Sequence, residues 1–190
     1  MAGSFLRISI LLGLFSLATL AAKAQEVVHA VAGTVNHINL PAKTITVVTD
    51  DGSEGTFKDL TNPKTSIDFE KKLRAEAIAA DAFKNEGTHV IVYYFGDGDV
   101  RTAVALQNLG PGPLTKSTGT VVKFSREQRL LTIQDQSGAI ESFKINERTV
   151  AETGSGVVEG MKFEPDKGDH LRVTATKANG SATALFINAG

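Results

Sequence analysis

Histidine is the residue of this sequence with the widest chemical range, because imidazole binds metals and exchanges protons near neutral pH. The chain contains a repeated unit, and His89 and His170 occupy the same place in its two copies, directly after a turn. A metal site needs about three or four ligands that converge, whereas equivalent places in two copies lie apart. We therefore interpret both as exposed residues at strand starts. His37 stands where the second copy has Lys123, which also indicates a solvent-facing side chain.

Two acidic turns could offer carboxylates to calcium. They read Asp50-Asp51-Gly52 and Asp97-Gly98-Asp99. Calcium takes about six to eight oxygen ligands, and neither turn is followed by a bidentate glutamate in loop register. Asp-Gly is instead a preferred sequence for hairpin turns. We therefore expect turns at both places, and neither a metal nor another cofactor.

The sequence lacks the motifs that mark common enzymes: a G-x-S-x-G elbow, H-E-x-x-H and a phosphate-binding loop. It has no cysteine, which excludes thiolate metal sites and cysteine nucleophiles. Copper-carrying OB barrels use Met, His and an aromatic side chain, but beyond residue 24 the only methionine is Met161 and there is no Trp. We predict a secreted, non-enzymatic module that binds a protein partner or a small ligand. A periplasmic metal-binding OB-type protein and an enzyme with a scattered site are the alternatives.

The elements that position these residues occur twice. Residues 33–58 read GTVNHINLPAKTITVVTDDGSEGTFK, and residues 119–144 read GTVVKFSREQRLLTIQDQSGAIESFK. Aligned without a gap at an offset of 86, the two stretches share seven of 26 residues. Self-similarity at a fixed spacing indicates a duplicated structural unit.

Each copy of this stretch predicts three strands. Val35 and Ile38 lie three residues apart, as do Val121 and Phe124, so both members of a pair face inward only if the strand has a bulge. The second strand alternates between apolar and polar residues, and a glycine turn joins it to the third. The other expected inward residues are Ile45, Val47 and Phe57 in the first copy and Leu131, Ile133 and Phe143 in the second.

Two more strands follow a middle part that differs between the copies. Asp68–Glu86 predicts an α-helix, with an Asp N-cap, an Ala-rich interior and Gly87 beyond its end. Glu147–Lys167 is rich in glycine and predicts a loop with at most one helical turn. Five strands with a helix between the third and fourth is the order of an OB-type barrel. The predicted fold class is mainly β: two tandem five-stranded OB-like barrels, the first with an inserted α-helix between strands 3 and 4.

Composition and turn residues divide the chain into four parts. Residues 1–24 are typical of a signal peptide, with Arg7, an apolar run over 8–20 and an Ala22-Lys23-Ala24 cleavage site. We name residues 25–109 the first repeat, 110–115 the Gly/Pro linker and 116–190 the second repeat. The apolar run is shorter than the roughly 20 residues that a membrane span requires. We expect cleavage after Ala24, a periplasmic or extracellular location and no membrane span.

The charge of the exported chain argues against nucleic acid as a partner. Removing Arg7 and Lys23 leaves 18 basic residues against 21 acidic ones, a net charge of −3. Proteins that bind nucleic acid usually carry a basic patch and a basic isoelectric point. We therefore expect no nucleic-acid partner.

The outer face of the fourth strand differs in character between the repeats. It carries His170, Arg172, Thr174 and Thr176 in the second repeat, and His89, Ile91, Tyr93 and Phe95 in the first. We expect the second-repeat set to be solvated. A strand that is apolar on both faces is expected to be buried on both. Either the predicted helix covers Ile91, Tyr93 and Phe95, or they form an interaction face for the second repeat or a partner. They are our candidate binding residues, and we expect the repeats to pack together.

A pattern of turn and core residues runs through both repeats. It comprises Gly33-x-Val35, Thr44–Val47, Gly52 and Gly87-x-x-Val90-x-Val92, and it recurs in the second repeat from Gly119 to Ala184. In this pattern the chain resembles the bacterial secreted repeats grouped as domain of unknown function 5666. The long helix predicted in the first repeat departs from it. The resemblance implies small exported barrels and adds no catalytic residue.

Overall fold

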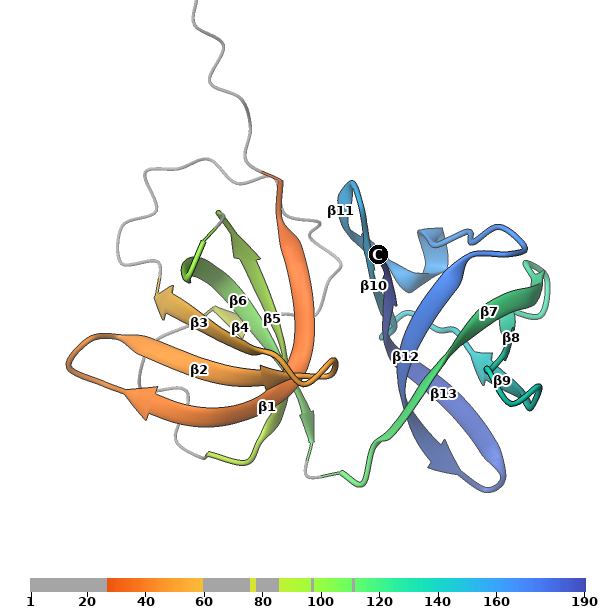
Figure 1. Cartoon of the computed structure of the whole chain (residues 1–190), viewed down its shortest axis with the longest axis horizontal. Helices are drawn as coiled ribbons and strands as arrows, with labels where there is room; N and C mark the ends of the chain where they lie inside the picture. Colours follow the sequence, from red (N-terminus) through yellow and green to blue (C-terminus); the bar gives the residue numbers. More distant parts are fainter. Residues whose placement is uncertain (1–26, 60–75, 78–85, 97, 111) are drawn as a thin grey trace, which may run out of the picture.

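The computed structural model of this protein describes residues 27–59, 76–77, 86–96, 98–110 and 112–190. Regular structure in these residues is almost entirely β-strand, in two sheets that follow one another along the chain (Figure 1). No helix in these ranges is long and apolar enough to cross a membrane. The predicted signal peptide lies outside the described residues.

The first sheet belongs to the first repeat. It pairs in the order β3-β2-β1-β5-β6-β4, and β3 also pairs with β6 in parallel, which closes five strands into a barrel. Closure removes the unpaired edges at which strands of other chains could add. The strands are β1 (His29–Asn39), β2 (Thr44–Thr49), β3 (Glu54–Asp59), β4 (Glu76–Ala77), β5 (His89–Phe95) and β6 (Val100–Gly110).

The second sheet belongs to the second repeat and uses the same strand order around its centre. It pairs as β11-β10-β13-β12-β7-β8-β9, and β13 also pairs with β9 in parallel, so five of its strands join in a ring. The strands are β7 (Thr115–Ser125), β8 (Leu130–Gln134), β9 (Ile140–Lys144), β10 (Val150–Thr153), β11 (Gly156–Glu159), β12 (His170–Ala178) and β13 (Ser181–Ala189).

The bulge predicted from the three-residue spacing is confirmed in both repeats. The pairing of β1 with β2 shifts register between Val35 and His37, and that of β7 with β8 shifts between Val121 and Lys123. The shift returns the next apolar residue to the inner face, as a bulge does. The core of the first barrel contains Val35, Ile45, Val47, Phe57, Val90 and Val92, and that of the second repeat contains Val121, Leu131, Ile133, Phe143, Leu171 and Val173.

The segment between the third and fourth strands differs from the predictions. The sequence predicts an α-helix over Asp68–Glu86, but Glu76–Ala77 within it form β4 and pair with β6. The prediction of a continuous helix is therefore wrong. Residues 68–75 and 78–85 lie outside the described residues. The loop predicted over Glu147–Lys167 contains the hairpin β10–β11 and one turn of 3-10 helix, η2 (Gly160–Lys162). β10 forms because it pairs with the edge of β13, which offers free backbone hydrogen-bonding groups. A contact between segments so far apart leaves no periodic pattern in the sequence.

Candidate interaction face and an open hollow

Strand β5 is buried on both faces, as its sequence suggests. Val90 and Val92 point into the first barrel. Ile91 and Tyr93 alternate with them and are 0% exposed, so they are covered from outside the barrel. The residues that pack around them come from both repeats.

An apolar cluster joins the two repeats, and we call it the inter-repeat cluster. From the first repeat it contains Ile91 and Tyr93, and from the second Val150 of β10 and Phe186 of β13. Phe95, the third candidate residue, is half-buried and is not a member. The remaining buried members are Val28, Ala30, Ala32 and Ala105. Two of these, Ala30 and Ala32, are small residues on β1.

The buried Tyr93 hydroxyl keeps a polar partner within this apolar surrounding. It donates to Oε1 of Gln107 at 2.9 Å. Burial raises the pKa of the Tyr93 hydroxyl, because the phenolate form loses water on entering the interior. The hydroxyl is therefore a fixed, neutral donor in the physiological range.

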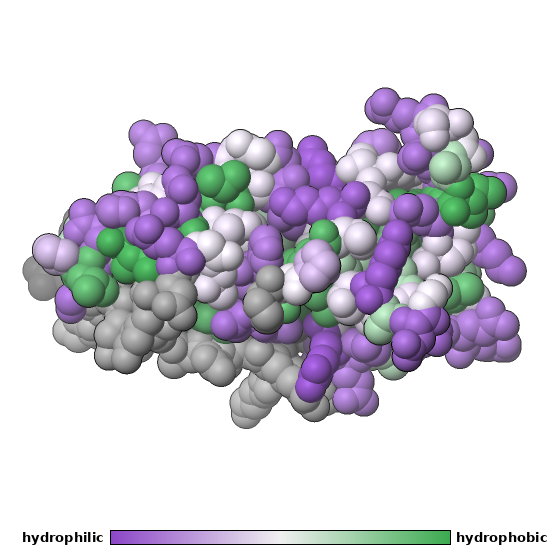
Figure 2. Space-filling view, turned by 90° about the horizontal axis from the view of Figure 1, so that it is seen from below, coloured by the Kyte–Doolittle hydropathy of each residue, from purple (hydrophilic) through white to green (hydrophobic). Residues whose placement is uncertain are grey.

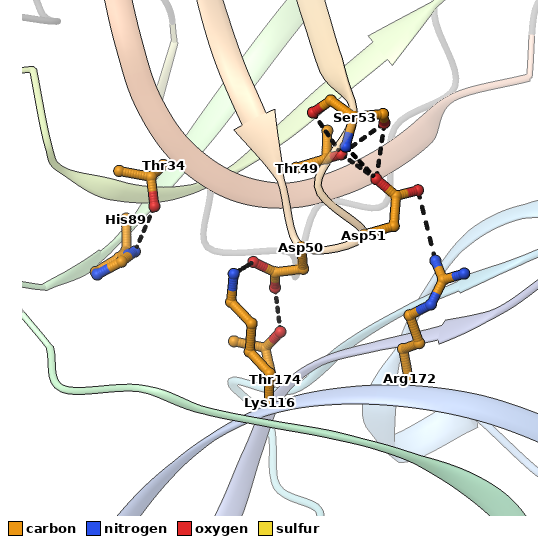
Figure 3. Close-up of polar contacts among 9 residues, drawn as sticks. All are labelled: Thr34, Thr49, Asp50, Asp51, Ser53, His89, Lys116, Arg172 and Thr174. Carbon is orange, nitrogen blue, oxygen red and sulfur yellow. Dashed lines mark hydrogen bonds and ion pairs between the residues drawn. The ribbon is translucent and has the colours of Figure 1, made fainter.

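Polar contacts border the inter-repeat cluster on the side of the β2–β3 turn (Figure 3). Lys116 of β7 places its Nζ 2.7 Å from Oδ1 of Asp50, and the Thr174 hydroxyl donates to Oδ2 of Asp50. Arg172 lies 3.5 Å from the neighbouring Asp51. The acidic turn of the first repeat therefore docks on basic and hydroxyl side chains of the second.

Asp51 also organises its own turn. Its Oδ1 accepts hydrogen bonds from the hydroxyls of Thr49 and Ser53 and, at 2.9 Å, from the Ser53 N–H. These bonds lower the pKa of Asp51 to about 2, and the Arg172 guanidinium adds a smaller effect in the same direction. The turn thus presents the ionised Asp51 carboxylate to Arg172 of the second repeat at neutral pH.

A small cavity of about 20 Å³ lies between the acidic turn and the second repeat. Its polar lining includes Asp50, Arg172 and Asn188, and its apolar lining includes Phe186. A cavity of about 10–15 Å³ is large enough to hold one water molecule. The two repeats therefore fit together with space for about a single water, too little for a ligand.

A second polar contact lies where β1 begins. Glu152 of β10 accepts the Ala30 N–H at 2.7 Å and lies 2.6 Å from Nδ1 of His29. Burial raises the pKa of Glu152, and the bonds from His29 and Ala30 partly oppose that shift. Strand β11 also contacts the residue before β1: the Val157 N–H donates to the Val28 carbonyl at 2.9 Å. The repeats are joined at both ends of their contact.

The other three histidines lie apart, and His89, expected to be exposed, is half-buried. His89 bonds the Thr34 hydroxyl at 2.9 Å, His170 is exposed, and His37 lies 3.2 Å from a Glu86 carboxylate oxygen. Within the described ranges, no group of three or more His, Asp or Glu is placed to hold a metal ion.

An open hollow of about 540 Å³ lies in the second repeat, away from the inter-repeat cluster. It is bounded by the β7–β8 turn, the segment after β9 and the helical turn η2. Its lining residues are Arg129, Ile145, Asn146, Glu147, Arg148 and Met161. Two guanidinium groups, an amide and two apolar side chains are the groups that a small polar ligand with an apolar part would need.

Sequence reasoning named the β5 face but missed its counterpart in the second repeat. Thr174, expected to be solvated, is 4% exposed because it lies against Asp50. The charges could have indicated this contact. The turn is acidic, Asp50-Asp51, in the first repeat but neutral, Gln136-Ser137, in the second. The second repeat carries the basic residues Lys116 and Arg172, which could pair with the acidic turn. Nothing in the sequence indicated the hollow, because its lining comes from three separate turns.

The remaining described surface shows no extended apolar face. Its exposed large apolar residues are Val27, Leu40, Val100 and Ile140, which lie far apart in the sequence. On the face shown in Figure 2, hydrophobic residues form small separate groups among hydrophilic ones. Scattered exposed apolar residues are normal for a folded protein.

Comparison with known proteins adds little to this description. No protein-family model matches the chain, and no curated protein matches it. Among solved structures, the crystal structure of Ag(I)CusF is similar at a TM-score of 0.32 and 15% identity, over 42% of this chain and 100% of that one. A likeness at this level carries no argument about function.

Proposed function

We propose that this protein is an exported, non-enzymatic binding module in which two tandem OB-like barrels act as one unit. The first repeat supports the second through the inter-repeat cluster. The second repeat binds a small ligand in its hollow. The resemblance to domain of unknown function 5666 supports export and the barrel fold, and the ligand is argued from the site alone.

The open hollow is the observation that carries this proposal. Ile91 and Tyr93 are 0% exposed within the inter-repeat cluster, so they leave no apolar surface open to another partner. The hollow keeps the side chain of Arg148 exposed, and Arg129 and Met161 are half-buried there. The hollow is shallow and widely open, so a bound ligand would keep part of its surface in water.

A thermal-shift panel on the purified protein tests the proposal. The panel contains organic anions, neutral and cationic compounds of similar size, and Cu⁺, Zn²⁺ and Ca²⁺. A ligand that binds only the native state raises the Tm with concentration. We expect an organic compound to do so and to be recovered chemically unchanged. Turnover of a compound would favour the enzyme alternative, and stabilisation by a metal alone would favour the metal-binding one.

Export has its own test. If residues 1–24 are a signal peptide, the protein recovered from the cell envelope or medium begins at Gln25. The intact mass decides this, and recovery of a chain that retains Met1 would contradict export by cleavage.

A further inference from the structure

We propose that the hollow of the second repeat binds an amphiphilic carboxylate, in which a carboxylate group is carried on a short hydrocarbon body. This inference rests on the proposed function and names the ligand class. It follows from how the two arginines, the local charge and the apolar lining are placed.

Arg129 is held in position by the backbone around it. Its residue has a positive φ of 49° in the β7–β8 turn, and its carbonyl accepts the Ile145 N–H at 2.8 Å. Its Nη1 donates to the Met161 carbonyl at 2.8 Å. A guanidinium has five N–H donors, so this bond fixes the group while it leaves other donors for a ligand.

Arg148 supplies a second guanidinium with a different setting. Its backbone N–H donates to Oδ1 of Asn146 at 2.8 Å, and the Thr149 N–H donates to the Asn146 carbonyl at 3.0 Å, which closes the turn. Its side chain is exposed and makes no hydrogen bond or ion pair with another of the described residues. The turn therefore fixes the base of this side chain while its charged end stays available.

The charge at the hollow favours an anion. Arg129 and Arg148 outnumber the one acidic lining residue, Glu147, whereas the whole chain has a net charge of −1. Exposed Lys144 and Lys162 flank the lining residues in the chain. Arginine pairs with carboxylates through two parallel N–H···O bonds, which gives both geometry and affinity.

The apolar part of the lining selects an organic anion over an inorganic one. Ile145 is 4% exposed, so most of its side chain already lies in the core, and Met161 is half-buried beside Arg129. Methionine adapts its shape to apolar ligands. A hydrocarbon body would cover the open part of Met161, whereas a bare phosphate would leave it exposed to water.

Octanoate is the probe for this inference, with inorganic phosphate and octylammonium as comparison compounds. Binding to the intact protein is followed by amide chemical shifts in NMR and by calorimetry. We expect saturable shifts at the amides of residues 145–148 and 161, and no comparable binding of octylammonium. Arg148→Glu should lower the affinity for octanoate about tenfold or more, because it removes a charge-assisted hydrogen bond and adds charge repulsion. Lys123→Glu makes the same charge change at an exposed residue outside the hollow and should bind like wild type.

Several results would overturn the inference. They are equal affinity of wild type and Arg148→Glu, shifts confined to other strands, and phosphate binding as tight as that of octanoate. If octanoate fails while another panel compound binds without turnover, this inference falls and the proposed function stands. If a panel compound is turned over, or only a metal binds, the proposed function falls instead.

Discussion

Lys116 and Asp50 join the two repeats through an ion pair of 2.7 Å, with the Lys116 side chain 48% exposed and the Asp50 side chain 15% exposed. Ion pairs that retain this much water contribute about 0–1 kcal/mol. Full burial of one large apolar side chain contributes about 1.5–3 kcal/mol. The inter-repeat cluster therefore supplies most of the free energy of the contact, and the polar pair fixes its register.

Ile91→Ala tests that comparison. Ile91 is 0% exposed between the barrel and the second repeat, so its truncation should lower the free energy of unfolding by about 2–5 kcal/mol. Phe95→Ala is the matched control on the same strand, because Phe95 is half-buried and lies outside the cluster. Phe95→Ala should lower the free energy of unfolding by less than Ile91→Ala does. Chemical denaturation of the intact protein measures both, and an equal or larger loss for Phe95→Ala would contradict this assignment.

Glu152 makes stability depend on pH. Burial raises its pKa above the ordinary value of 4.5, so its contribution is greatest below that pH and is lost as the pH rises through the raised pKa. Glu152→Gln is always neutral and keeps an acceptor for the Ala30 N–H, so its unfolding free energy should change less between about pH 4 and 6. Glu152→Ala leaves the Ala30 N–H without its acceptor and should lower the free energy of unfolding by about 1–3 kcal/mol. Equal pH slopes for wild type and Glu152→Gln would refute this role.

The glycine at the start of each of the similar stretches 33–58 and 119–144 is required by a close approach of strands. A Cβ on Gly33 would lie 2.4 Å from the Val48 carbonyl oxygen, and one on Gly119 would lie 2.5 Å from that of Gln134. Alanine at either position should destabilise the protein by about 1–3 kcal/mol, because the strands must move apart. Gly154→Ala is the control, since a Cβ there meets nothing within 4 Å. Thermal melting separates the three variants, and no drop in Tm at Gly33 or Gly119 would contradict this explanation.

The sequence predicted the repeat-based part of the fold well. The bulges after Val35 and Val121 and the inward Phe57 and Phe143 are confirmed. The glycine turn between the second and third strands is also confirmed, and Gly52 there has a positive φ of 86°. These features depend on local spacing and on turn residues, and a second copy of the same pattern supports each of them.

Features that depend on contacts between distant segments could not be predicted. Helix propensity in the Ala-rich segment gave no sign that residues 76–77 pair with β6, because an available strand edge can override propensity. The β10–β11 hairpin likewise depends on pairing with β13. The contact between Asp50 and Thr174 and the hollow beside Arg129 arise only when turns from separate strands meet.

The central claim is that the two repeats form one unit, and ¹⁵N NMR relaxation of the intact protein tests it most directly. Amides of β1–β3 and those of β7–β9 should give the same rotational correlation time, that of a single body containing both repeats. Tyr93→Ala, which opens the inter-repeat cluster, should let the two values separate. Distinct and shorter correlation times for the two repeats of the wild-type protein would contradict the claim.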